Sequence, residues 1–330
     1  MIGSYFLGRE IFHEKQLAFA FAFSFSFSSM YFINTTLALL DGISAAFIAI
    51  SLPFLLKVSP SKLLGRNLAL AGFFMGLALT SKLLAITGIL VTFAYVLLLL
   101  KTRLSRKLLI LLLFCIVIGI VFIVVQPRMW FDPAARLAEM VSKNAGRISI
   151  GHPVPISMLP GGNNSWIGPK VRYPPWWTFA YWTLIMASPF QLVGIILAIP
   201  TVKKLSRELK FASLACLTPI AYLIIEGVYL PQYLTFLSLP LSLIAITGYS
   251  QTNRITRKAV MLMSATTILA PVEDVLWTQA GLNLAFTPIW LQLLQWVAVL
   301  LLLDLAGVRL GNPRIPNLTW AAAKRQGTRP

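Results

Sequence analysis

Two charged residues interrupt apolar runs in the N-terminal third of the chain and are the first candidates for a site. Asp41, in the run LALLDGISAAF, is the only acidic residue between Glu14 and Asp132, and Lys82 stands between two apolar segments. A carboxylate in a membrane helix costs several kcal/mol unless it is paired, hydrated or functional. Each residue also has a plain structural interpretation. Asp41 suits the positive end of a helix dipole, and Lys82 suits a cation that reaches the membrane surface along its apolar stem.

The other polar groups that can meet a substrate are concentrated in residues 126–176, the longest stretch that is not predominantly apolar. Its candidate residues are the cations Lys170 and Arg172, His152, and the aromatic residues Trp130, Tyr173 and Trp176. Tyr173, Trp176 and Trp177 also fit an interfacial aromatic belt, and Arg172 fits a cation at phosphate level. His152 has no second histidine near it, and both cysteines lie in apolar runs. The sequence therefore predicts no metal site and no cofactor, and a divalent metal remains an open alternative.

The composition indicates an all-α, polytopic membrane protein. Of the 330 residues, 58% are hydrophobic and 12% are charged, and the mean hydropathy is +0.79. Soluble domains carry about a quarter charged residues. Continuous apolar runs disfavour a β-barrel, whose strands alternate. The net charge of +18 lies mainly in short loops between apolar runs. This placement indicates membrane topology and anionic headgroups, not nucleic acid.

The apolar runs predict a bundle of ten membrane segments, because a helix needs about 20 residues to cross a bilayer. These segments are residues 16–33, 37–56, 68–80, 83–100, 108–125, 177–199, 211–230, 233–250, 259–272 and 287–308. Residues 68–80 and 259–272 are short for a full span. The chain divides into N-terminal membrane helices (1–125), an outer loop (126–176), C-terminal membrane helices (177–308) and a basic tail (309–330).

The basic residues predict which side each loop faces. Most Lys and Arg residues fall in alternate loops, at residues 9–15, 57–66, 101–107, 203–210, 254–258 and 309–329. Cytoplasmic loops of membrane proteins carry an excess of Lys and Arg. We therefore expect a cell-membrane protein with a cytoplasmic C-terminus, whose residues 126–176 lie on the extracytoplasmic side together with Asp41 and Lys82.

The outer loop begins with a predicted amphipathic helix. Asp132 can cap this helix, Pro133 suits its first position, and Glu139 precedes Lys143 at the supportive i,i+4 spacing. The apolar residues of one face are Ala134, Leu137, Met140 and Val141. We expect this helix to end near Asn144 and to lie on the outer membrane surface. The glycine-rich residues 145–169 are expected to form a loop.

Several stretches together resemble one enzyme class. They are SYFLGREIFHEKQLAFAFAF, SSMYFINTTLALLDGISAAFIAISL, GRNLALAGFFMGLALTSKLLAITGILV, VRYPPWWTFAYWTLIMASPFQLVGIIL and VYLPQYLTFLSLPLSLIAITGY. In order and spacing they resemble the GT-C integral-membrane glycosyltransferases, in the branch of dolichyl-phosphate-mannose protein mannosyltransferases and aminoarabinose transferases. The resemblance covers most of residues 1–250. The matching stretches do not include the family's first helices or its acidic first outer loop, and Gln232-Tyr233 replaces an Arg-Tyr pair.

The resemblance implies transfer of a sugar from a polyprenyl-phosphate carrier to a protein, lipid or glycan acceptor at the outer face. Asp41 would orient the site or the acceptor. Lys82, Lys170 and Arg172 would bind the donor phosphate, and Trp130, Tyr173, Trp176 and His152 would contact sugar or lipid. The missing acidic loop would come from an upstream segment or a partner chain, or the protein would be a degenerate relative of the family. Two alternatives stay open, a non-catalytic membrane subunit and a lipid or solute transporter, although the sequence shows no convincing internal repeat.

Overall fold

The structure, a computed structural model, describes residues 1–28, 31–32, 40–59, 65–150, 154–155, 166–167, 183–184, 187–200, 206–226, 235–251, 255, 257–268 and 289–305. For residues 144–150, 154–155, 166–167, 223–226, 289–292 and 304–305 it describes the backbone alone. The predicted all-α fold is confirmed for these residues, apart from one pair of two-residue strands.

The N-terminal part holds helices α1 (Ile2–Phe12), α2 (Lys15–Ser26), α4 (Leu40–Leu56), α5 (Arg66–Ser81), α6 (Ile86–Ala94), α7 (Leu104–Val125) and α8 (Pro133–Ile150). Short turns extend them: η1 (Leu83–Ala85), the π-helical η2 (Tyr95–Leu99) and η3 (Pro127–Met129). The C-terminal part holds α10 (Pro189–Ala198), α11 (Arg207–Glu226), α12 (Thr235–Ser250), α13 (Arg257–Ala265), η7 (Thr266–Ile268) and α15 (Ile289–Leu305). Each predicted apolar segment thus coincides at least partly with helix.

The segment after Asn144 differs from the prediction. The helix α8 does not end there but continues to Ile150, because the following residues include good helix formers and a single glycine, Gly146, does not stop it. Within the predicted loop, β1 (Val154–Pro155) and β2 (Trp166–Ile167) pair antiparallel.

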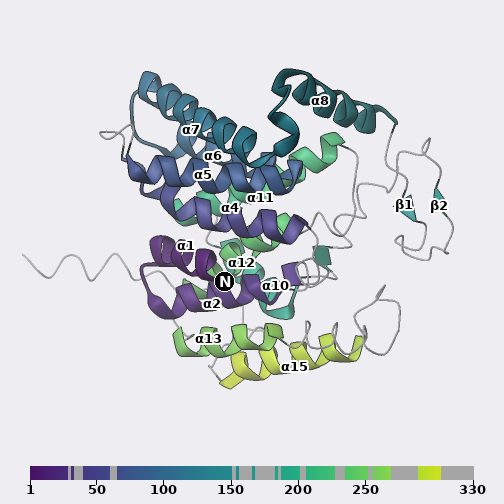
Figure 1. Cartoon of the computed structure of the whole chain (residues 1–330). Coiled ribbons are helices and arrows are strands. Elements are labelled where there is room, and N and C mark those ends of the chain that lie inside the picture. Colours follow the sequence, from purple (N-terminus) through teal and green to yellow (C-terminus); the bar gives the residue numbers. More distant parts are fainter. Residues whose placement is uncertain are drawn as a thin grey trace, which may run out of the picture.

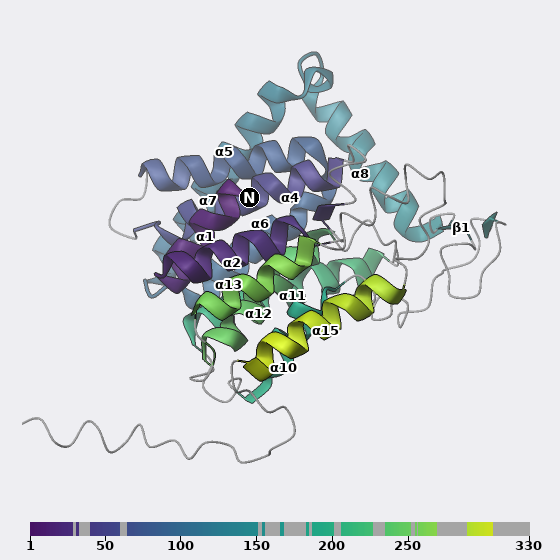
Figure 2. The ribbon, with the colours of Figure 1, turned by 90° about the horizontal axis from the view of Figure 1, so that it is seen from below.

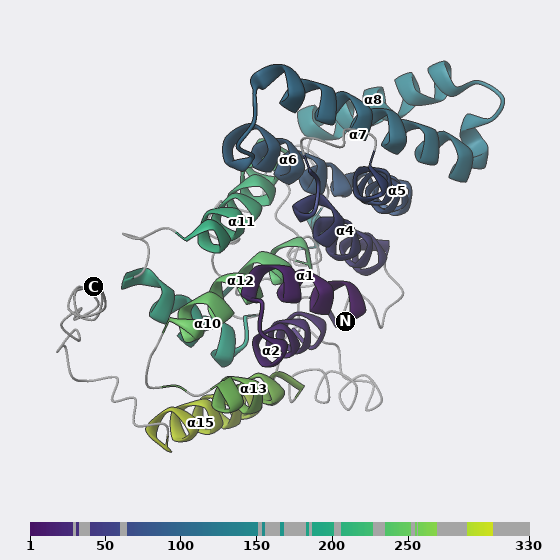
Figure 3. The same ribbon diagram turned by 90° about the vertical axis from the view of Figure 1, so that its left-hand side faces the viewer.

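The helices pack as neighbours in a curved bundle. Helix α5 lies between α4 and α7, and α1 and α2 connect this group to α12 and α13. Figure 1 shows α4, α5 and α7 above α1 and α2, with α13 and α15 below them. Viewed from below, α15 and α13 cover the lower face (Figure 2). Figure 3 shows that α8 lies at the edge of the bundle beside α7.

Glycines allow the closest helix approaches. Gly72 and Gly76 lie one turn apart on α5, so they share a face. An added Cβ would come within 2.8 Å of Val117 at the first position and 2.7 Å of Val121 at the second. Gly-xxx-Gly spacing of this kind lets two helix backbones approach each other closely. The face formed by Gly72 and Gly76 therefore sets the distance between α5 and α7.

The interior is mainly apolar but also holds polar side chains, and the surface carries many large apolar side chains. Hydroxyl and amide side chains lie inside, such as Gln191, which donates to Ser242 Oγ at 2.8 Å. Large apolar side chains lie outside, and along α7 these include Leu108, Leu112 and Ile120. Soluble monomers rarely expose contiguous apolar faces. By length and composition α7 is able to cross a membrane, and the other apolar helices of the described residues are shorter.

Polar contacts join several basic loops at one end of the bundle. Lys57, after α4, pairs with Glu10 of α1 at 2.7 Å. Arg257, at the start of α13, pairs with Glu14 at 2.9 Å. The start of α11 and the π-helical turn η2 meet at the same end. Both ion pairs involve residues from the loops that the charge pattern assigned to one side of the membrane.

Alanine substitutions at two glycines of neighbouring helices should have opposite effects on stability. Gly76→Ala should lower the free energy of unfolding by about 1–2 kcal/mol, because overpacking outweighs the gain in helix propensity. Gly119→Ala on α7 should raise it by about 0.5–1 kcal/mol, since nothing lies within 4 Å of the added Cβ. Thermal unfolding of the two purified variants measures both effects, and equal shifts would contradict this packing.

Candidate functional site

The structure brings the two charged candidates of the N-terminal third together. Lys82 Nζ lies 2.9 Å from Asp41 Oδ2 in an ion pair. The Asp41 side chain is almost fully buried, at 2% exposure, whereas the Lys82 side chain is 31% exposed. The charge of the carboxylate is therefore buried, and the ammonium connects it to the surface.

The register of α4 and α5 places this pair. The two helices are antiparallel neighbours, and two buried hydroxyls join them: Ser51 donates to the Ala71 carbonyl at 2.7 Å and Ser44 donates to the Ala78 carbonyl at 3.0 Å. One further step in the same register brings Asp41, in the first turn of α4, opposite the end of α5. Helix α5 stops at Ser81, and Lys82 has an extended backbone with φ −154° and ψ 132°. This break directs the lysine side chain to the carboxylate.

One oxygen of the carboxylate remains available. Asp41 Oδ2 accepts from Lys82, whereas the buried Oδ1 has no hydrogen-bond partner among the described residues. Leaving a buried polar group unsatisfied costs about 1–3 kcal/mol. A ligand hydroxyl or amine that donated to Oδ1 would recover this cost.

The end of α7 completes the polar site. Gln126 follows α7, and its amide donates to the Thr80 carbonyl at 3.0 Å, two residues before Lys82. The predicted residue Trp130 lies close to the same helix end. Its indole N–H donates to the carbonyls of Ile123 and Val124, each at 3.1 Å, while 62% of the residue is exposed. Trp130 therefore satisfies carbonyls that the helix leaves open.

An apolar cavity of about 740 Å³ adjoins this site. Its lining comes from α5, η1, α6, α7, η3, α8 and α11: Leu79, Leu83, Ile86, Ile118, Gly119, Phe122, Ile123, Met129, Pro133, Ala134, Leu137, Met140, Val141 and Tyr222. Leu83, one of the lining residues, directly follows Lys82 in the chain, whereas Lys82 and Asp41 themselves do not line the cavity. The predicted apolar face of α8 forms one wall of this cavity.

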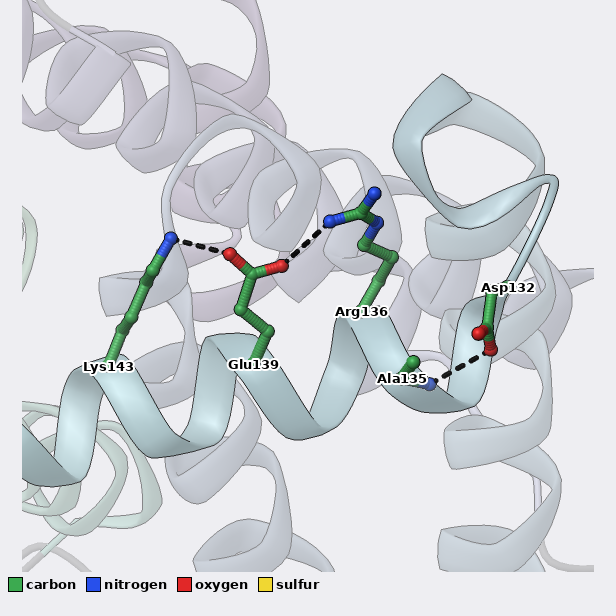
Figure 4. A network of polar contacts seen from close by, with 5 residues as sticks. All are labelled: Asp132, Ala135, Arg136, Glu139 and Lys143. Atoms are coloured by element: carbon green, nitrogen blue, oxygen red, sulfur yellow. Dashed lines mark hydrogen bonds and ion pairs between the residues drawn. The ribbon is translucent and has the colours of Figure 1, made fainter.

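The polar face of α8 carries a chain of short contacts (Figure 4). Asp132 Oδ1 accepts from the backbone N–H of Ala135 at 3.0 Å, which confirms the predicted cap. Glu139 pairs with Lys143 at 2.6 Å, as predicted, and with Arg136 at 2.9 Å. The hydrogen bond from Lys143, followed by that from Arg136, lowers the pKa of Glu139.

The remaining candidates cannot be placed in this site. His152, Lys170, Arg172, Tyr173 and Trp176 lie outside the described residues. Among the residues that the structure describes, no group of three or more His, Cys, Asp or Glu side chains is arranged to hold a metal ion.

Sequence reasoning missed Gln126 and the apolar lining of the cavity. The sequence signal for Gln126 was its position as the first polar residue after a long apolar run. The cavity depends on where α8 packs, and no local pattern shows this.

Comparisons with models of known protein families, with curated proteins and with solved structures found no match for this chain.

The Glu139 contacts predict a pH dependence of α8. Because the folded helix lowers the pKa of this carboxyl group, the stabilisation is fully present above the ordinary glutamate pKa and is lost as pH falls through the lowered value. The protection factors of the amides of residues 133–143, which correct for the intrinsic pH dependence of hydrogen exchange, should fall over that acidic range. The measurement uses the Asp132→Asn variant, because asparagine still caps the helix but does not titrate.

Glu139→Gln is the matched control for this dependence. The protection factors in that variant should be lower at neutral pH and nearly independent of acidification. Identical pH profiles with and without Glu139 would show that its two ion pairs do not stabilise α8.

Proposed function

We propose that this protein is a multi-pass membrane glycosyltransferase that moves a sugar from a polyprenyl-phosphate carrier to an acceptor on the extracytoplasmic face. The observation that carries the proposal is the Asp41–Lys82 ion pair beside an apolar cavity of about 740 Å³. A polyprenyl-phosphate sugar combines an anionic group with a hydrocarbon chain. The site offers a cation and an apolar space in the same arrangement. The motifs that resemble GT-C enzymes include both Asp41 and Lys82.

The distribution of polarity supports the membrane part of this proposal. Leucine, isoleucine and valine cover the outside of α7, and leucine and valine cover the outside of α15, while serine, threonine and glutamine lie between helices. Helices in lipid associate through small residues and interhelical hydrogen bonds, because lipid tails are as apolar as leucine. The proposal is that all ten apolar segments cross or enter the bilayer. The basic end then faces the cytoplasm, and the end with Asp41, Lys82 and α8 faces outward.

The chemistry assigned to Lys82 is electrostatic. In the proposed transfer, an acceptor oxygen forms a bond to the anomeric carbon of the sugar and gives up its proton to solvent water. The bond from that carbon to the phosphate oxygen breaks, and polyprenyl phosphate leaves with the additional negative charge. A cation fixed at the leaving phosphate stabilises the transition state. Lys170 and Arg172 would add further positive charge.

Asp41 is proposed as a positioning residue. It holds the Lys82 ammonium through Oδ2, and its unpartnered Oδ1 is suited to a donor group of the acceptor. Trp130, with its largely exposed indole, is suited to the sugar or the adjoining lipid. His152, Tyr173 and Trp176 remain further proposed contacts.

One observation favours a non-catalytic subunit as the second candidate. Asp41 is the only carboxylate among the buried residues of the described ranges, and it is already paired with a lysine. A general base would then have to come from elsewhere, such as a partner chain that carries acidic residues in an outer loop. In that case Asp41 and Lys82 would bind the donor without reacting.

Cysteine labelling tests the proposed orientation. In a Cys115→Ala/Cys216→Ala background, Ser142→Cys lies on the exposed face of α8 and Ser105→Cys lies in the first turn of α7. A membrane-impermeant maleimide should label Ser142→Cys in intact cells and Ser105→Cys only after permeabilisation. Labelling of both positions from outside would contradict the arrangement.

Sugar transfer tests the proposed site. Membranes containing the full chain are supplied with a polyprenyl-phosphate sugar, and transfer to acceptor is followed. Lys82→Ala should reduce kcat/KM by about a hundredfold, the cost of removing one charge-stabilising group. Lys82→Arg should restore part of this loss. Asp41→Asn should lower kcat more than it raises KM, because Lys82 would no longer be held in place.

The control is an ion pair at the opposite end of the bundle. Glu14→Gln breaks the contact with Arg257 and should leave transfer unchanged. Unchanged transfer in both Lys82→Ala and Asp41→Asn would remove this pair from the site. Donor binding without transfer, in the presence and absence of other membrane proteins, would favour the subunit interpretation.

A further inference from the structure

Gly119 is unusual among the helical glycines of this chain. At the other glycines whose surroundings are described, an added Cβ would meet an atom within 3.0 Å, as at Gly72 and Gly76. At Gly119 nothing lies within 4 Å. Close helix packing explains those other glycines, and it does not explain this one.

A glycine in the middle of a helix has a cost. It destabilises the helix by about 0.5–1 kcal/mol relative to alanine, because the chain loses more conformational freedom on folding. Gly119 lies well inside the 22-residue helix α7, between Ile118 and Ile120. Its missing side chain adds space to the apolar cavity, of which it is a lining residue. The helix therefore gives up stability at the position where a side chain would fill the cavity.

The position of Gly119 along α7 relates it to the ion pair. Gln126, which bonds to the carbonyl of Thr80, marks the level of the polar site. At about 1.5 Å per residue, Gly119 lies about 10 Å along the helix from Gln126. A ligand whose charged group reached Lys82 would need a chain of about that length to pass Gly119.

We propose that Gly119 determines which lipid chain the site accepts, by leaving room for the branched chain of a polyprenyl phosphate. This inference rests on the proposed function and names its structural determinant. The occupant follows from charge complementarity: an anionic head at Lys82 and an apolar chain between α7 and α8. The cavity of about 740 Å³ suits the part of the chain next to the phosphate, because pockets of about 300–1,000 Å³ hold ligands of drug size.

Gly119 gives the cavity the additional width that a methyl-branched chain needs. A methyl-branched chain is wider than a linear one at each branch, and the absent side chain widens the cavity on the α7 side. A linear chain would leave part of this width empty and would lose the corresponding van der Waals contacts. The site should therefore prefer an isoprenoid chain to a linear chain of equal length.

Direct binding to the purified full chain tests this inference without sugar transfer. The probes are geranylgeranyl phosphate, whose chain passes Gly119, dimethylallyl phosphate, whose chain is too short to reach it, and hexadecyl phosphate, which is linear. Gly119→Leu should weaken binding of geranylgeranyl phosphate about tenfold, because it excludes the equivalent of about two methylene groups from apolar contact. Binding of dimethylallyl phosphate should not change. The unmodified protein should bind hexadecyl phosphate more weakly than geranylgeranyl phosphate.

Matched variants separate a filled cavity from a damaged fold. Ile120→Phe adds bulk at the next position, on the exposed face of α7 and outside the cavity lining, and should leave all three affinities unchanged. Gly119→Ala should give an intermediate loss of geranylgeranyl phosphate binding together with a higher melting temperature. Thermal unfolding confirms that each variant is folded.

Each outcome has a defined meaning. Unchanged geranylgeranyl phosphate binding in Gly119→Leu, equal losses for the long and short probes, or equal affinity for the linear probe would overturn the inference. Sugar transfer by the unmodified protein would still support the proposed function in those cases. Conversely, the expected binding pattern without transfer under any donor and acceptor would support the lipid-chain site and count against the enzyme.

Discussion

The buried carboxylate of Asp41 is the constraint on which the arrangement of the N-terminal helices depends. It requires a cation, and Lys82 meets this requirement only because the α4–α5 register, held by Ser44 and Ser51, brings the end of α5 opposite the start of α4. Removing one partner of a buried ion pair typically costs about 3–5 kcal/mol. The helix must also break at Lys82 for the side chain to reach Asp41. The ion pair therefore requires both the α4–α5 register and the helix break at Lys82.

Much of the helical framework follows from local sequence, whereas the site depends on contacts between distant segments. Asp132 as a cap and the Glu139–Lys143 pair were predictable because they lie within one helix. Asp41 and Lys82 were recognisable as candidates because charges are scarce in apolar runs, but their contact at 2.9 Å depends on the packing of α4 on α5. The continuation of α8 beyond Asn144 was missed, because a glycine-rich stretch resembles a loop.

Glycines show why composition alone does not reveal a cavity. Gly76 and Gly119 both lie in long apolar helices and have similar neighbours in the sequence. In the structure the first is pressed against Val121, and the second faces open space. One glycine brings two helices together, and the other keeps a space open between them. Gly76 packs against α7, whereas Gly119 lines the cavity between α7 and α8, and these different contacts distinguish the two roles.

The double hydrogen bond from Trp130 to the end of α7 has a mechanical consequence. It fixes the turn between α7 and α8 to the end of α7, while Asp41 in α4 and Lys82 between α5 and η1 take no part in it. A small rotation about this turn would widen or narrow the wall formed by Leu137 and Val141 without moving the ion pair. Under the proposed function, substitutions in the α8 wall would change the shape of the cavity, and substitutions of Asp41 or Lys82 would separately change the charged site.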